Sequence, residues 1–471
     1  MRSAAGGLLL SLLIGGCSDA TGPPTDPGAL AAPRVYATLG FGDAPVTGEV
    51  ILDPLPPSSS VGAQAPWQYE VDLDGDGDPD ASGDVSERVA VPYRFEDIGP
   101  HRIEILLERG QERESREEFV VVNDPAVIEV LGSAELPSQS TDAFFVGIAI
   151  DRKGEQLFVG VQRPSDPPVY ALDAASLAVT DSLNLEDFGP TAAWGLSAAP
   201  DEDLLYVADR GFDLAVLSTV GGLELLRRFG TTIGSFGVEA FPGRRALVGG
   251  RGSGLALIDT ETGAVLREFR IPLDAGIRNF AVSPDRSRIA LPLLRTEGPS
   301  DLLLLDAQNL VPIWSTDLAL SDPPEPLPPE AFTVNDAVSF SADGERIYVI
   351  RLTLGVQHEG RRHFLVLNAA DGRLVRRMII DRDSGARTCA APLLCNSGPN
   401  AAAISADGRF VAFSGVSIKG LFVDRGLDLP LYRTPLLSNI HCCGVAASPI
   451  ADEFFFVSEL DARVTKVRLR R

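Results

Sequence analysis

Short runs of alternating apolar and polar residues, each ended by a turn, fill most of the chain after residue 33. Alternation with a period of two places apolar side chains on one face of a β-strand. Long patterns with the 3.6-residue period of an amphipathic helix are scarce. The pattern therefore predicts an all-β chain of many short strands joined by turns rich in glycine, proline and aspartate.

From residue 124 to residue 471 this pattern repeats in seven units. In each unit a first apolar strand turns into a second, and these stretches begin at Ala149, Ala198, Ala240, Val282, Phe340, Ile404 and Ala447. A third strand then ends in Asp or Asn and turns into a fourth, as in LALIDTETGAVLREF. Where there is no insertion the period is about 42 residues, which is the length of a four-stranded propeller blade.

These repeats resemble the YVTN-type propeller repeats of bacterial surface and periplasmic proteins, whose core is S-P-D-G-x-x-x-Y-V followed by V-x-V-I-D-x-x-T-G. The resemblance implies a seven-bladed β-propeller over residues 124–471. The last unit ends with Arg463–Leu469 as its third strand. We therefore expect Ala126–Leu131 to supply the missing fourth strand, which closes the ring and removes an exposed edge.

Residues 34–123 carry alternating runs of their own without the repeat. The expected strands are Arg34–Leu39, Gly48–Leu52, Gln68–Val71, Arg88–Tyr93, His101–Leu107 and Glu117–Val122. Six or seven short strands in about 90 residues are typical of a β-sandwich. The stretches YEVDLDGDGDPDASGD and RFEDIGPHRIEILLE resemble the polycystic-kidney-disease (PKD) domain, which implies an immunoglobulin-like (Ig-like) sandwich. His101 and Val71 replace that family's usual Tyr and Trp, and the alternation is kept.

One loop of this segment has an aspartate at every second position, at Asp72, Asp74, Asp76, Asp78 and Asp80. Carboxylates this close repel one another unless a hard cation lies among them. The start of the loop matches the calcium-binding pattern D-x-D-x-D-G, but Gly83 occupies the twelfth position, where an EF-hand has a bidentate glutamate. The loop predicts a weak, structural Ca²⁺ site, with a solvated acidic turn as the alternative.

The first 33 residues predict export. Residues 1–16 have the basic start and short apolar run of a signal peptide, too short to span a bilayer. They end in Ile14-Gly15-Gly16-Cys17, which resembles the lipobox of bacterial lipoproteins and implies that Cys17 is the lipidated residue. Residues 17–33 form a flexible tether rich in proline and glycine. In lipoproteins of this kind Ser18 favours the outer membrane, facing the periplasm or the cell surface; an ordinary signal peptide is the alternative.

The chain carries a formal net charge of −24. Such a surface repels phosphate backbones, so nucleic acid is excluded as a partner, and we expect a soluble monomer held to a membrane by its lipid.

The long connections between the repeats fall on one side of the expected ring. Insertions gathered on one face mark a binding face. The residues at the channel mouth on this face include Trp194, Phe236, Arg278, Asn279, Asp336, Asn400 and His441. They could hold a protein, a peptide or a small polar ligand, although aromatic residues such as Trp194 and Phe236 often pack between blades instead.

Four cysteines remain after lipidation, and all lie in two successive connections between blades: Cys389, Cys395, Cys442 and Cys443. In an oxidising compartment an even number favours disulfides, and three pairings are open. Zinc held by His441 and these cysteines is a sharper alternative. His358 and His363 flank the sequence HEGRRH, which we interpret as a solvated loop.

No catalytic motif stands out in the sequence: there is no G-x-S-x-G, and no C-x-x-C-H for haem attachment. We therefore favour a non-enzymatic binding or scaffolding lipoprotein that docks partners on the loop-rich face of its propeller. The alternative is a periplasmic enzyme that resembles the propeller lactonases or dehydrogenases, with its site at the channel mouth. Calcium is the one cofactor that the residues suggest.

Overall fold

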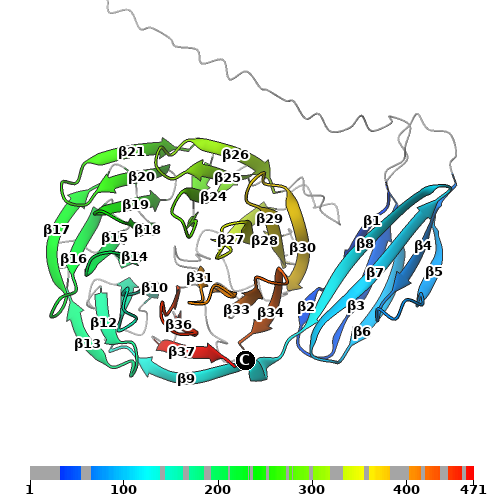
Figure 1. Cartoon of the computed structure of the whole chain (residues 1–471), viewed down its shortest axis with the longest axis horizontal. Coiled ribbons are helices and arrows are strands. Elements are labelled where there is room, and N and C mark those ends of the chain that lie inside the picture. Colours follow the sequence, from blue (N-terminus) through cyan, green and yellow to red (C-terminus); the bar gives the residue numbers. More distant parts are fainter. Residues whose placement is uncertain are drawn as a thin grey trace, which may run out of the picture.

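The fold is all-β. The computed structural model describes residues 32–54, 65–137, 144–162, 169–184, 193–209, 213–231, 233, 237–250, 254–271, 275–277, 279–295, 301–318, 332–354, 360–381, 402–414, 420–434, 444–458 and 463–470. Within these residues the helical content is one short 3-10 turn, η1 (Pro125–Val127). Figure 1 shows a ring of small sheets with a second, separate pair of sheets at its side.

The described residues between Arg34 and Val122 form a two-sheet β-sandwich. Its strands are β1 (Arg34–Ala37), β2 (Phe41–Gly42), β3 (Val46–Asp53), β4 (Trp67–Asp72), β5 (Ala81–Val85), β6 (Val89–Phe95), β7 (Gly99–Arg109) and β8 (Glu112–Val122). One sheet has the order β1-β3-β6 and the other β2-β8-β7-β4-β5. The chain passes from the first sheet to the second between β1 and β2, and β2 runs parallel to the end of β8. The short strands β2 and β5 were not predicted from the sequence.

The remaining strands form seven sheets, each of four strands apart from the fourth, whose inner strand is split in two. The first three blades are β10 (Phe144–Ile150), β11 (Gln156–Gln162), β12 (Val169–Asp173) and β13 (Val179–Leu183); β14 (Ala193–Ala198), β15 (Leu204–Asp209), β16 (Asp213–Ser218) and β17 (Glu224–Gly230); and β18 (Gly237–Phe241), β19 (Arg245–Gly250), β20 (Gly254–Asp259) and β21 (Val265–Arg270).

The next two blades are β22 (Ala275–Ile277) with β23 (Ala281–Val282), β24 (Arg288–Arg295), β25 (Asp301–Asp306) and β26 (Pro312–Asp317); and β27 (Phe332–Phe340), β28 (Arg346–Leu354), β29 (Gly360–Asn368) and β30 (Leu374–Asp381). The last two are β31 (Ala402–Ile404), β32 (Phe410–Phe413), β33 (Leu421–Asp424) and β34 (Leu429–Arg433); and β35 (Val445–Ala447), β36 (Glu453–Ser458), β37 (Arg463–Leu469) and β9 (Ile128–Glu135). The predicted propeller is therefore confirmed, with seven blades in the described part of the chain.

The repeated turn sequences explain why the blades form. In the turn after β27, the Ser341 hydroxyl donates to the Asp343 carboxylate at 2.5 Å and accepts from the Arg346 N–H at 2.9 Å. Gly344 takes the left-handed conformation (φ 72°) that this turn requires. The turn after β20 uses Asp259, whose carboxylate accepts from the Thr262 N–H and hydroxyl at 2.8 and 3.0 Å. Each turn thus satisfies its own polar groups within a few residues.

The seventh blade joins the two ends of the propeller. β37 pairs with β9 along its whole length, from Arg463 opposite Glu135 to Leu469 opposite Ile128. The predicted closure of the ring is confirmed, because β9 begins inside the segment expected to supply the fourth strand. Pairing with β9 gives the seventh blade its fourth strand, so that it forms a four-stranded sheet like the other blades.

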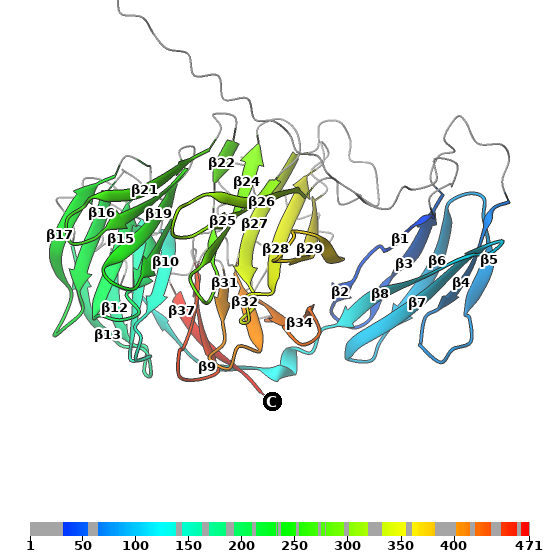
Figure 2. The same ribbon diagram turned by 45° about the horizontal axis from the view of Figure 1, so that its top comes forward.

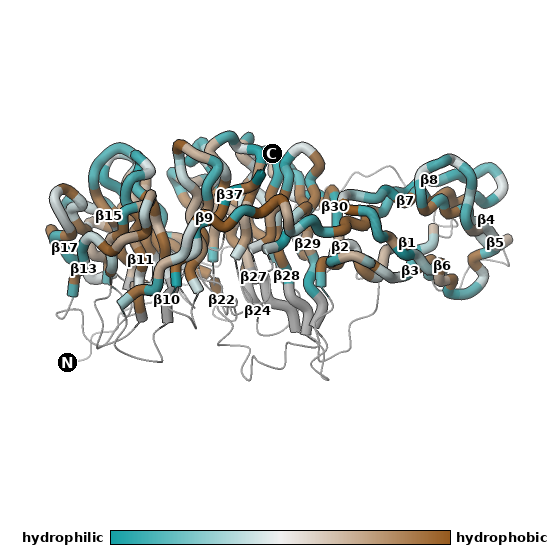
Figure 3. The backbone as a smooth tube through the Cα atoms, turned by 90° about the horizontal axis from the view of Figure 1, so that it is seen from below, coloured by the Kyte–Doolittle hydropathy of each residue, from teal (hydrophilic) through white to brown (hydrophobic). Residues whose placement is uncertain are grey.

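Apolar side chains fill the spaces between successive blades. One such cluster lies between the fourth and fifth blades and contains Leu304, Phe340 and Leu365, all buried. Figure 3 shows the apolar stretches inside the strands and hydrophilic turns grouped at one face of the ring. Burial of this kind contributes about 25 cal/mol per Å² of apolar surface, so the blade interfaces are the main source of stability.

The sandwich is docked on the fifth and sixth blades by a shared apolar core. Phe41 and Val121 of the sandwich belong to the same buried cluster as Tyr348, Phe364 and Met378 of the fifth blade. Figure 1 shows β2 beside β30 and β34, and Figure 2 shows the same contact after rotation. The sandwich and the ring are therefore one packed unit at this point.

A buried asparagine completes the junction. The Asn123 amide donates to the Asp43 carboxylate at 2.7 Å and to the Arg433 carbonyl at 3.3 Å, and its oxygen accepts from the Arg433 N–H at 2.8 Å. Asn123 is only 4% exposed and directly follows β8. Its bonds hold the link between the sandwich and η1 in one position.

Candidate functional site

The two faces of the ring differ in the length of their connections. In each blade the turn after the first strand, and in the first six blades the turn between the third and fourth strands, has three to five residues. On the opposite face the connections between blades include residues 318–331, between β26 and β27, and residues 382–401, between β30 and β31. The expected loop-rich face is thus the one from which the first strands start.

A central channel runs through the ring. It is a cavity of about 440 Å³ lined by the first strands of all seven blades. Most of its lining is small or apolar, from residues such as Ala149, Val238, Ala403 and Val445, with the hydroxyls of Ser197 and Ser339. A channel of this kind offers a ligand few charged contacts apart from one ion pair.

That ion pair joins the third blade to the fourth. Arg286, in the turn between β23 and β24, lies 3.3 Å from the Glu239 carboxylate of β18 and also donates to the Ala240 carbonyl. Ser197 of the second blade donates to the other Glu239 oxygen at 3.4 Å. Desolvation raises the pKa of Glu239, although Arg286 and Ser197 partly oppose this.

This pair lies toward the tight-turn end of the channel, because Arg286 belongs to one of the short turns. Glu239 was not among the site residues predicted from the sequence. A signal was present, since Glu239 is an acidic residue inside an innermost strand whose neighbours are apolar. The pair links three successive blades and is satisfied within the protein, so its first role is structural.

The structure describes three of the predicted channel-mouth residues. Trp194 lies in β14, where the pairing shifts register, and is 5% exposed. Asn279 is 3% exposed and lies just before Phe280 of the channel lining. The backbone of Asp336 lies in β27, at a register shift between Asn335 and Ala337. Phe236, Arg278, Asn400 and His441 lie outside the described residues.

The aspartate-rich loop joins β4 to β5 at the surface of the sandwich. Carboxylate oxygens of Asp72, Asp74 and Asp80 lie within 4.8 Å of one another. Asp72 accepts from the N–H groups of Gly75 and Gly77 at 2.7 and 2.9 Å. Desolvation raises the pKa of Asp72, but these bonds outweigh it and the pKa is lowered. Asp80 accepts from the Leu73 N–H at 2.7 Å.

The loop therefore gathers three of the five predicted carboxylates, and its backbone N–H groups favour the ionised form of Asp72. Asp76 accepts from the Asp78 N–H at 2.8 Å, and Asp78 has no place in the group of three. The same three carboxylates also stabilise the loop, because each of them accepts a hydrogen bond from a backbone N–H of the turn. The oxygen-rich group is chemically suited to a hard cation such as Ca²⁺.

One interpretation of a histidine was wrong. His363 does not belong to a solvated loop, because β29 extends to Gly360 and His363 lies within it at 6% exposure. The Arg377 Nε lies 3.4 Å from its Nδ1. A long, regular hairpin of β28 and β29 replaces most of the expected loop, and His358 lies outside the described residues.

The remaining predicted groups are not covered by the structure. Cys17 and the four cysteines at 389, 395, 442 and 443 lie outside the described residues. Among the residues that are described, no helix is long and apolar enough to cross a membrane.

No family model matches the chain, and no curated protein matches it. Among solved structures the chain is similar to the β-propeller domain of Cps50 (Swd1) from Myceliophteria thermophila, at 14% sequence identity and a TM-score of 0.47. The alignment covers 72% of this chain and 99% of that domain. The propeller itself is evident from the sheet order and the ring of Figure 1.

Proposed function

We propose that this chain is an exported, lipid-anchored binding protein that docks a protein, peptide or small polar ligand on the loop-rich face of its propeller. The asymmetry of the connections carries this proposal. Folding alone needs only short turns, and on one face of the ring every described turn has five residues or fewer. The connections on the other face are longer, as between β26 and β27 and between β30 and β31. Proteins that bind through loops on a rigid scaffold show the same asymmetry.

The tight-turn face is less suited to binding because its polar groups are already engaged. Asp343 accepts from Ser341 and pairs with Arg425 at 3.0 Å, and Asp285 accepts from Ser283 and Ser287. A ligand on this face would have to break these bonds before it formed its own.

The anchor and the sandwich complete the proposal. Cys17 would carry the lipid, and residues 17–33 would hold the molecule away from an outer membrane. The sandwich would be an Ig-like module of the PKD kind, which is supported by its two-sheet order and by its aspartate-rich loop. Its docking on the fifth and sixth blades would set the distance and orientation of the ring relative to the anchor.

Paired substitutions on the two faces test the binding proposal. Immobilised full-length protein carrying Arg278→Glu and Asp336→Arg should retain at most about a tenth of the partner that the unmodified protein captures from extracts of its own cells. Arg373→Glu, at an exposed position in the turn between β29 and β30, is the control and should leave capture unchanged. If only the Arg373→Glu variant lost capture, the binding face would be the tight-turn face. If the double variant and the control both retained capture, the proposed binding face would be wrong.

A substitution at Cys17 tests the anchor separately. Cys17→Ala should abolish labelling by radioactive palmitate and move the protein from the membrane fraction to the soluble fraction, because three acyl chains are enough for stable anchoring. Equal labelling of the variant and the unmodified protein would contradict the lipid anchor, whatever the outcome for the propeller face.

A further inference from the structure

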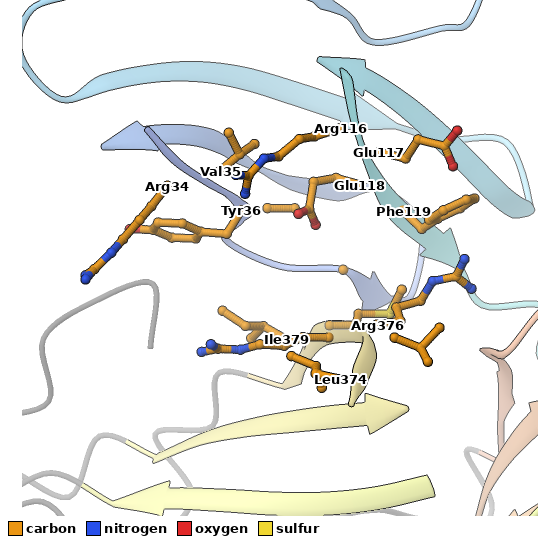
Figure 4. A pocket seen from close by; sticks show the side chains of 15 residues that line it. Arg34, Val35, Tyr36, Arg116, Glu117, Glu118, Phe119, Leu374, Arg376 and Ile379 are labelled. Carbon is orange, nitrogen blue, oxygen red and sulfur yellow. The ribbon is translucent and has the colours of Figure 1, made fainter. Parts of the chain in front are cut away.

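An open cavity lies between the sandwich and the propeller. It is an open groove of about 550 Å³, shown in Figure 4, with walls from β1, β8 and β30. All three are edge strands or nearly so. β1 and β30 end their sheets, and β8 has a neighbour on its outer side only where β2 pairs with Val121 and Val122. Edge strands are templates for an added strand.

Gly40, at the end of this groove, shows what fits between the two edges. Its N–H donates to the Ile379 carbonyl of β30 at 2.7 Å, and its carbonyl accepts from the Val121 N–H of β8 at 2.8 Å. The chain at this point therefore lies as an extended segment bonded to both edges. A Cβ here would lie 2.3 Å from the Met378 Cγ, so only glycine permits the approach. The groove continues this path along β30 toward Leu374.

The lining of the groove is basic in a chain that is strongly acidic. Arg34 of β1, Arg116 of β8, and Arg376 and Arg377 of β30 line it, against two carboxylates, Glu117 and Glu118. Apolar side chains, among them Tyr36, Phe119 and Leu374, form the rest of the wall. A β-strand points alternate side chains to opposite sides. An extended peptide with alternating acidic and apolar residues could therefore place its carboxylates near the arginines and its apolar side chains against the apolar part of the lining.

Glu118 marks the centre of the charged wall. In Figure 4 its carboxylate points into the groove near Arg116, between β1 and β30. Desolvation raises its pKa to about 7, although the Ala37 N–H, Arg377, Arg116 and Arg376 all oppose the shift. The other charged residues that line the groove are Glu117 of β8 and Arg34 of β1, and Glu114 of β8 pairs with Arg116 at 2.8 Å. The ionised Glu118 carboxylate would compete with a bound carboxylate for these arginines. Its ionised form is also the one that desolvation disfavours.

We propose that this groove binds an extended acidic peptide segment of another protein, which adds a strand along β30 and places its carboxylates on the arginines that now face Glu118. The mode is strand addition, in which backbone bonds give affinity and alternate side chains give specificity. Binding makes the site more negative and so favours the protonated form of Glu118. The segment therefore binds more tightly at pH 6 than at pH 8, with uptake of a proton.

Fluorescence anisotropy with the full-length protein tests this site. The probe is a labelled hexapeptide of alternating valine and glutamate with blocked ends. The matched probes carry lysine in place of glutamate, or N-methyl groups on alternate amides. We expect saturable binding of the glutamate peptide, with affinity at least tenfold weaker for each matched probe. Equal binding of all three peptides, or of none, would overturn the proposal.

Two pairs of variants locate the site. Val375 lines the groove and is 42% exposed, and Val375→Trp should fill the groove and abolish binding. Val265→Trp is its control, since Val265 lies on the outer strand of the third blade with the same 42% exposure. Arg116→Glu should weaken binding about tenfold, whereas Arg113→Glu, on the same strand but outside the groove lining, should not.

The pH dependence and the oligomeric state complete the test. Glu118→Gln should bind equally well at pH 6 and pH 8, whereas the unmodified protein should bind several-fold more tightly at pH 6. An unmodified protein without this dependence would contradict the role of Glu118. A dimer in sedimentation that Val375→Trp dissociates would overturn the proposal in favour of a second copy as the occupant. None of these outcomes depends on the loop-rich face.

Discussion

Two kinds of interface hold this molecule together, and they leave different traces in the sequence. Between blades, Phe340 packs with Leu304 and Leu365 in a core that recurs around the ring because each unit repeats. At the junction, Phe41 enters a core with Tyr348 and Met378, and Gly40 and Asn123 make unique bonds to Ile379 and Arg433. Both interfaces contain buried apolar side chains, yet only the first recurs with the period of the repeats. A repeat reveals contacts between its own copies and says nothing about what docks on them.

Replacing one phenylalanine from each interface would test whether the junction is as strong as the blades. Phe41→Ala and Phe340→Ala each remove a buried ring, so each should lower the free energy of unfolding by about 3–5 kcal/mol in urea titrations. Hydrogen exchange should rise at β2 and β30 in the first variant, and around β27 in the second. A loss below about 1 kcal/mol for Phe41→Ala would show that the sandwich is only loosely attached.

The two groups of aspartates offer a smaller test of the same contrast. In the repeat turns each carboxylate is satisfied by its own turn, whereas in the sandwich Asp72, Asp74 and Asp80 converge. Ca²⁺ at ten times its Kd should therefore stabilise the protein by about 1.4 kcal/mol, seen as a higher melting temperature in calorimetry than with EDTA. Asp74→Asn should remove the effect. An unchanged melting temperature would mean that the loop serves only its own backbone.

The smallest effect is expected in a repeat turn and depends on pH. The hydroxyls of Ser283 and Ser287 lower the pKa of Asp285 to about 2, from an ordinary value of 3.8. This stabilisation is present above pH 4 and is lost as the pH falls toward 2, because protonation removes the acceptor. Asp285→Ala should cost about 1 kcal/mol at pH 7 and less than half as much at pH 2 in denaturant titrations, because protonation of the carboxylate becomes substantial only there. A constant difference across this range would contradict the assignment.

Sequence patterns predict most of this fold because they are local. The turns around Asp343 and Asp259 are held by hydrogen bonds between residues at most five positions apart. The strands between the turns are predicted by the alternation of apolar and polar residues. Closure of the ring also follows from counting strands. The strands β2 and β5 were not predicted because each is too short to show a clear alternation. His363 was assigned to a loop because the charged residues around it, which lie in β29, resemble those of a solvated loop.

The candidate sites were harder to predict, because they depend on residues that are distant in the sequence. The groove brings Glu118 to Arg377, and the channel brings Glu239 to Arg286 from the next blade. No spacing rule relates such residues until the blades are placed in order. The aspartate loop is the exception, because its three converging carboxylates come from nine consecutive residues.

Pairing of β37 with β9 has a consequence for how the chain acquires its shape. Arg463 and Glu135 are 328 positions apart, so the seventh blade is assembled only after almost all of the chain has been synthesised. Until then the edge of β9 that later pairs with β37 stays open beside the folded sandwich. Because an open strand edge can pair with another chain, a nascent or truncated chain is most prone to aggregate at this stage. Contacts of such high sequence separation also form slowly. Pairing of β37 thus completes the ring, and a chaperone that covers the edge of β9 would have its greatest effect just before β37 pairs with it.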